Sequence, residues 1–142
     1  MKVADLCAGT GFYGFEAISR GVEKVFFFEL EVKGCNLIEN IARSFNIDRS
    51  KYEIIRGDVT KSLKFFSEFY SEINFDLIFF DPPYKATFLD EVFNLVSDYN
   101  LLSRSGYFVV ETSDFRNLVF SGFKVFLQRD YGGSRVVFLE KG

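Results

Sequence analysis

The sequence predicts an α/β domain built on a mostly parallel, doubly wound sheet, and three observations support this fold class. Strand-like and helix-like segments alternate along most of the 142 residues, as they do in chains of βαβ units. A glycine-rich turn at residues 9–14 follows the first strand-like segment. Two further strand-like segments joined by a Gly-Gly turn close the chain and predict a hairpin.

Each expected element follows from its residue pattern. Short runs of Val, Ile and Phe predict buried strands, and apolar residues three or four apart predict helices. Gly21 is placed to end the first helix and Thr60 to cap the third. The expected strands are 2–7, 24–29, 52–56, 75–80, 106–111, 123–129 and 135–140, and the expected helices are 13–20, 32–45, 61–70 and 87–97. The alternating part predicts a sheet of order 3-2-1-4-5, and the hairpin places one antiparallel strand at the edge.

Composition limits the classes of function. A chain of this length predicts one domain, 1–142, for which we expect a monomer. The chain contains no histidine, which excludes imidazole bases and His-bearing metal sites, and we expect no metal. Its two cysteines, Cys7 and Cys35, are too few for a disulfide framework, and Cys7 is expected to be a small buried apolar residue. No apolar run approaches the roughly 18–20 residues that span a membrane, and no signal peptide is visible, so we expect a cytoplasmic protein without a membrane partner.

The charge of the chain is mildly acidic. Its net charge is −3 and its pI is near 5.1, which counts against a large nucleic-acid footprint. A local basic patch remains compatible with these values, because the residues after position 100 are mildly basic. A mixed solvated surface explains that half of the chain equally well.

The glycine turn fits the pattern Gly-x-Gly-x-x-Gly, with Gly9, Gly11 and Gly14. Glycines allow a tight turn and the close approach of a ligand, and the following helix presents free N–H groups at its positive end. Glu29 ends the next strand about twenty residues later, where an acid accepts hydrogen bonds from ribose hydroxyls. These features fit a nicotinamide dinucleotide and S-adenosylmethionine equally.

Two carboxylates favour S-adenosylmethionine over a dinucleotide. Asp5 lies at the end of the first strand, where its charge suits an ammonium and a sulfonium and would repel a pyrophosphate. Asp58 follows the third strand, where it can accept a hydrogen bond from the exocyclic amine of an adenine. Each has a structural alternative, because Asp5 can be a turn former and Asp58 can be the N-cap of the next helix.

The stretch Asp81-Pro82-Pro83-Tyr84 follows the strand at 75–80 and holds both prolines of the chain. In a sheet of this order, ligands bind in the crevice between the first and fourth strands, where the strand order reverses. The stretch therefore faces the glycine turn across that crevice. The parallel sheet with its closing hairpin is typical of the class I methyltransferase variant of the Rossmann sheet.

The chemistry of such a stretch suits methyl transfer to an amino nitrogen. An exocyclic amine of a base is a poor nucleophile and must be aimed at the methyl group. The Asp81 carboxylate and the Pro82 carbonyl would accept hydrogen bonds from its N–H groups, and Pro83 would fix that carbonyl. Tyr84 would supply a ring on which the base stacks. No strong base is required, which agrees with the absence of histidine.

Several motifs resemble the bacterial 16S rRNA guanine-N2 methyltransferases (the RsmD-like family). The motifs are 5–11, Gly14, 16–17, 19–21, Asn40, Asp58, 75–84 and 131–134. The resemblance implies an enzyme that uses S-adenosylmethionine to methylate the exocyclic N2 of a guanine, with ribosomal RNA or the small ribosomal subunit as partner. It implies cofactor contacts at Asp5, Ala8, Gly9, Thr10, Gly11, Glu29, Asp58 and Val59, and catalytic roles for Asp81, Pro82, Pro83 and Tyr84.

One departure from this family keeps other functions open. Its members carry a basic N-terminal arm before the first strand, whereas this chain begins at that strand. The alternatives are the same chemistry on adenine N6 of DNA or RNA, a truncated and inactive S-adenosylmethionine-binding domain, and a nicotinamide dehydrogenase.

Overall fold

The computed structural model describes residues 1–83, 87–113 and 119–142. The strands are β1 (Lys2–Leu6), β2 (Lys24–Glu29), β3 (Tyr52–Arg56), β4 (Phe75–Phe80), β5 (Leu102–Thr112), β6 (Phe123–Tyr131) and β7 (Ser134–Lys141). The helices are α1 (Phe12–Ser19), α2 (Val32–Ser44), α3 (Val59–Phe69) and α4 (Leu89–Asp98), with a short 3-10 turn, η1 (Arg49–Lys51). Within the described ranges, no helix has the length and apolar character needed to cross a membrane.

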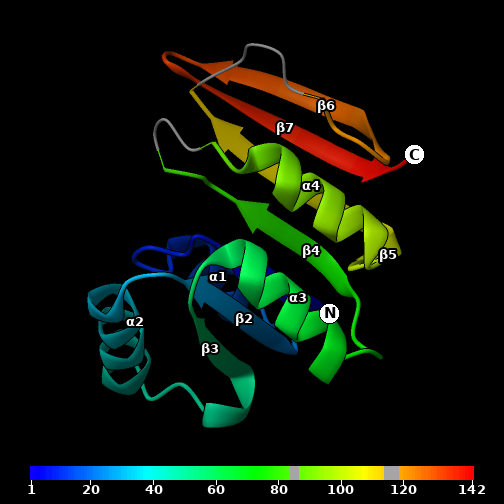
Figure 1. Cartoon of the computed structure of the whole chain (residues 1–142). Helices are drawn as coiled ribbons and strands as arrows, with labels where there is room; N and C mark the ends of the chain where they lie inside the picture. Colours follow the sequence, from blue (N-terminus) through cyan, green and yellow to red (C-terminus); the bar gives the residue numbers. More distant parts are fainter. Residues whose placement is uncertain (84–86, 114–118) are drawn as a thin grey trace.

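The seven strands form one sheet in the order β3-β2-β1-β4-β5-β7-β6 (Figure 1). Strands β1 to β5 are parallel, and β7 runs antiparallel to both β5 and β6. The predicted order, the parallel sheet and the closing hairpin are confirmed. The expectation of an antiparallel strand at the edge is wrong, because β7 lies inside and β6 forms the edge. Burial agrees with this order, since Val137 and Leu139 of β7 are fully buried, whereas most of β6 is exposed.

Helices cover the two faces of the sheet unequally. Helices α3 and α4 pack on one face, which forms the larger core with Phe26, Phe28 and Phe80. Helices α1 and α2 pack on the other face, against β1, β2 and β3. Because both faces of β2 are covered, its side chains are apolar on both sides, and this explains the continuous run of Val and Phe.

Strand β5 begins four residues before its predicted start at 106. Leu102 pairs with Phe75, and the register of the β4–β5 pair shifts between Phe75 and Leu77. Gly106 lies against this irregularity, where an added Cβ would approach the Asp76 carbonyl oxygen to 2.9 Å. The polar residues 103–105 indicate a loop in the sequence, but their backbone extends the strand.

Candidate functional site

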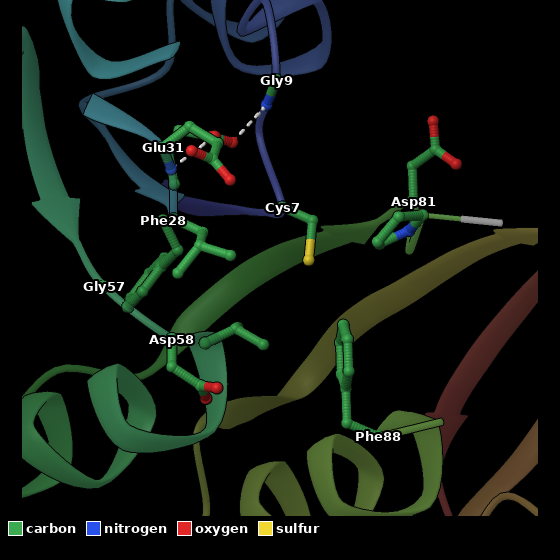
Figure 2. Close-up of a pocket in the computed structure, with 12 residues that line it drawn as sticks. Cys7, Gly9, Phe28, Glu31, Gly57, Asp58, Asp81 and Phe88 are labelled. Atoms are coloured by element: carbon green, nitrogen blue, oxygen red, sulfur yellow. Dashed lines mark hydrogen bonds between the residues drawn. The ribbon is translucent and has the colours of Figure 1, made fainter. Parts of the chain in front are cut away.

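A cavity of about 400 Å³ opens at the carboxyl ends of β1, β2 and β4, beside the loop that follows β3 (Figure 2). Its size lies within the range of small-molecule sites, roughly 300–1,000 Å³. It is lined by Cys7, Gly9, Phe28, Glu29, Leu30, Glu31, Gly57, Asp58, Val59, Asp81, Pro83 and Phe88. This is the predicted crevice between the first and fourth strands, which the structure confirms as a cavity.

Glu29, at the end of β2, is held in a fixed position on the wall of this cavity. Its Oε1 accepts a hydrogen bond from the N–H of Gly9 at 2.8 Å, and its Oε2 accepts one from the N–H of Glu31 at 3.0 Å (Figure 2). Gly34 of α2 packs directly behind it, and an added Cβ there would lie 2.7 Å from Oε2. The carboxylate thus joins the glycine turn to α2 while each oxygen retains a further lone pair for a ligand.

The three glycines of the turn have different tasks. Gly9 and Gly11 have φ values of 58° and 79°, in the left-handed region that glycine adopts readily. Gly14 instead allows α1 to pack closely on the sheet, because an added Cβ would lie 2.2 Å from the ring of Phe27 and 2.9 Å from Val25. Only Gly9 of the three lines the cavity among the described residues.

Asp5 lies beneath the glycine turn, outside the lining of the cavity. Its side chain is only 2% exposed, and it accepts a hydrogen bond of 3.0 Å from the N–H of Gly14 in α1. Burial raises the pKa of this carboxyl to about 7, and the charges of Asp81 and Glu29 act in the same direction. The structure therefore shows Asp5 tying β1 to α1, while its direct contact with a ligand stays a prediction.

Asp58 caps the N-terminus of α3, which is the structural alternative considered for it from the sequence. It is the N-cap of α3, where its Oδ1 accepts hydrogen bonds from the N–H groups of Thr60, at 2.9 Å, and Lys61, at 3.4 Å, and from the Thr60 hydroxyl. These hydrogen bonds lower its pKa, with the Thr60 hydroxyl as the largest cause. Asp58 also lines the cavity with Val59, so its contact with an adenine stays a compatible prediction.

The Asp81-Pro82-Pro83 stretch borders two cavities. Asp81 and Pro83 line the larger one, and Asp81 and Pro82 line a second cavity of about 310 Å³ with Glu111 and Ser134. Partial burial raises the pKa of Asp81, and the charge of Glu111 raises it further. Asp81 therefore lies where the two cavities meet. The predicted ring of Tyr84 falls outside the described residues.

The cavity brings together half of the predicted cofactor residues and adds apolar ones. Among the described residues, Gly9, Glu29, Asp58 and Val59 line it, whereas Asp5, Ala8, Thr10 and Gly11 do not. Leu30 and Phe88 also line the cavity, and no sequence motif marks them, because their residue types are those of an ordinary core. Leu30 is 59% exposed, so it is an apolar side chain at the rim rather than part of that core.

Cys7 packs against the core, but it is less buried than predicted. It is only partly buried, has a φ of 57°, and directs its sulfur into the cavity (Figure 2). Burial raises the pKa of the thiol to about 12, and the charges of Glu29 and Asp5 add to that rise. The thiol is therefore neutral and serves as a small, soft part of the wall rather than as a nucleophile.

The character of the cavity restricts its ligand. Four acidic residues, Glu29, Glu31, Asp58 and Asp81, line the cavity together with mostly apolar ones. Such a lining suits a ligand that has an apolar part, hydroxyl or amino donors for the carboxylates, and positive charge. Across the described ranges, no group of three or more metal-ligating side chains lies close enough to hold a metal ion.

Comparisons with known proteins agree with this description. The model of a family described as "Conserved hypothetical protein 95" matches residues 1–140. Ribosomal RNA small subunit methyltransferase D of Haemophilus influenzae is 30% identical over 112 residues, which are 79% of this chain and 56% of that protein. The chain spans a little over half the length of the curated relatives that it matches first.

Solved structures share the whole fold. A conserved hypothetical protein of Streptococcus pyogenes matches with a TM-score of 0.83 and 26% identity, over 99% of this chain and 86% of that one. The ribosomal protein L11 methylase of Lactobacillus delbrueckii matches with a TM-score of 0.73 and 15% identity, over 99% of this chain and 69% of that one, and at that identity it shows the fold alone. The fold is the Rossmann-like fold of class I S-adenosylmethionine-dependent methyltransferases.

Proposed function

This chain belongs to the family described as Conserved hypothetical protein 95, and we propose that it methylates the exocyclic N2 of a guanine in small-subunit ribosomal RNA, with S-adenosylmethionine as methyl donor. One observation carries the proposal. Asp81 and Pro83 line the same cavity as Gly9 and Glu29, so an amine held at Asp81 borders a ligand held at the glycine turn. The curated relatives with rRNA methyltransferase names support ribosomal RNA as the substrate class.

The residues of the larger cavity suit S-adenosylmethionine. The free lone pairs of Glu29 would accept the ribose hydroxyls, and the second carboxylate oxygen of Asp58 would accept a hydrogen bond from the adenine amine. Leu30 and Phe88 supply apolar surface for the adenine ring. The acidic surroundings suit a ligand that carries an ammonium and a sulfonium and would repel the pyrophosphate of a dinucleotide.

When bound, S-adenosylmethionine supplies a methyl group whose bond to sulfur breaks as the amine lone pair forms the new N–C bond, which leaves a neutral thioether. Asp81 accepts a hydrogen bond from the amine, and the Pro82 carbonyl accepts the second one. Both acceptors stabilise the positive charge that develops on the nitrogen in the transition state. The proton that leaves the nitrogen passes to Asp81, whose exposure lets it return the proton to water.

The test is transfer of labelled methyl from S-adenosylmethionine to unmodified small ribosomal subunits, followed by digestion to nucleosides. We expect label in N2-methylguanosine. Label in N6-methyladenosine would replace guanine by adenine as the target. Binding of S-adenosylhomocysteine without any transfer would show that the chain is a cofactor-binding domain without turnover, and a thermal shift with NAD alone would indicate a dehydrogenase.

A further inference from the structure

We infer that Glu111 selects guanine by accepting a hydrogen bond from its N1–H, in the second cavity beside Asp81. The inference rests on the proposed function and deepens it, because it assigns the choice of base to a residue outside the Asp-Pro-Pro stretch.

The second cavity is placed to receive the base. Its walls are Asp81, Pro82, Glu111, Thr112, Ser113 and Ser134. Among the described residues, Asp81 alone lines both this cavity and the larger one. A base in the second cavity would therefore present its amine to Asp81, while the cofactor approaches Asp81 from the larger cavity.

The sheet places Glu111 next to Asp81. The parallel register pairs Phe80 of β4 with Val110 of β5, so the next residues along these neighbouring strands are Asp81 and Glu111. The side chains of β5 alternate between faces, and Glu111 shares the α1 side with Val109. The closeness of the two carboxylates is also evident from the charge of Glu111, which raises the pKa of Asp81.

Glu111 is oriented by a residue almost a hundred positions away. The hydroxyl of Tyr13 in α1 donates a hydrogen bond of 2.6 Å to its Oε2. The Tyr13 ring is itself fixed, because it stacks on Phe79 with centroids 5.0 Å apart and planes within 15°. Over the described part of the chain, no residue donates to Oε1 and no Lys or Arg pairs with Glu111. Glu111 therefore offers one oriented, acceptor-only oxygen to the cavity.

This acceptor distinguishes the bases by their donor patterns. In guanine, the N2 amine lies next to N1–H, so two adjacent donors meet the two adjacent carboxylates of Asp81 and Glu111. In adenine and cytosine, the amine lies next to a ring nitrogen that is itself an acceptor. An ionised carboxylate has no hydrogen to offer that nitrogen, so these bases would leave two acceptors opposed and unpaired.

The test uses 2-aminopurine, which retains the 2-amino group of guanine but has an acceptor instead of N1–H. The RNA is a stem-loop that carries the guanine mapped on the small subunit, or 2-aminopurine at that position. For the parent chain we expect kcat/KM to fall on the order of tenfold to a hundredfold with 2-aminopurine. In Glu111→Gln, the amide N–H can turn toward the ring nitrogen of 2-aminopurine. The kcat/KM values of this variant for the two RNAs should therefore agree within about threefold.

The two RNAs are compared with the same protein variant, so a general loss of activity in that variant cancels from the ratio of the two kcat/KM values. Tyr13→Phe keeps the stacking on Phe79 but frees Glu111, and it should reduce the preference for guanine partway. The matched control is Glu91→Gln on the exposed side of α4, which should keep the parental preference.

Two results are decisive in different ways. N2-methylguanosine formation with an equal preference in Glu111→Gln and the parent would overturn the role of Glu111 and leave the proposed function standing. Binding of S-adenosylhomocysteine by a parent chain that labels no guanine would overturn both.

Discussion

Replacing Asp5 by asparagine should make the protein more stable at neutral pH. The Asp5 carboxyl is 2% exposed, and its burial raises the pKa from 3.8 to about 7. The folded chain therefore holds a proton between about pH 4 and 7 that the unfolded chain has released. Because the folded state binds more protons in this range, its free energy of unfolding falls as the pH rises.

The size of this effect follows from the rise in pKa. At about 1.4 kcal/mol per pKa unit, a change from 3.8 to about 7 corresponds to about 4 kcal/mol. Asparagine keeps an oxygen that accepts the hydrogen bond of Gly14 but has no charge to bury. The parent and Asp5→Asn should therefore be similarly stable near pH 4, and the variant should be more stable by about 4 kcal/mol near pH 7.5.

Urea unfolding at several pH values between 4 and 7.5, followed by circular dichroism, measures this difference. Glu72→Gln removes an exposed carboxylate from the loop before β4 and serves as the control, with the same pH dependence as the parent. If the free energy of unfolding changed with pH in the same way for the parent and Asp5→Asn, the reasoning would be refuted. Asp5 would then have the same pKa in the folded and unfolded states.

Three further changes test the site. Gly14→Ala should lower the free energy of unfolding by about 2 kcal/mol, since its Cβ would lie 2.2 Å from Phe27 in a packed core; a urea titration that shows no loss would mean that this core yields. Glu29→Ala is expected to weaken S-adenosylhomocysteine binding by about tenfold in calorimetry, because a charged acceptor is lost, and an unchanged Kd would remove Glu29 from the cofactor site. Asp81→Ala should abolish methyl transfer while the Kd for S-adenosylhomocysteine stays within about twofold, and near-normal turnover would contradict its aiming role.

The sequence predicted the sheet well because its central strands are covered on both faces. A strand such as β2 then consists of a continuous apolar run, and glycines at the following turn mark where the chain must leave the sheet. The position of the crevice follows from strand order, so the sequence alone predicts that Gly9, Glu29, Asp58 and Asp81 lie around it.

The parts that the sequence missed depend on contacts between distant residues. The hydrogen bond between Tyr13 and Glu111 joins α1 to β5 and has no local pattern. Leu30 and Phe88 become cavity walls only through the placement of β2 and α4 around the crevice. The inner position of β7 depends on its pairing with β5, and Asp58 could not be assigned to capping without the geometry of α3.

Gly34 has a consequence for any attempt to stabilise this protein. Glycine in a helix costs about 1 kcal/mol relative to alanine, so position 34 in α2 is an obvious candidate for a stabilising substitution. The added methyl group would nonetheless lie 2.7 Å from the oxygen by which Glu29 holds the chain after β2. The helix thus forgoes stability to leave room for a carboxylate, and an engineer who improves α2 elsewhere should leave this residue alone.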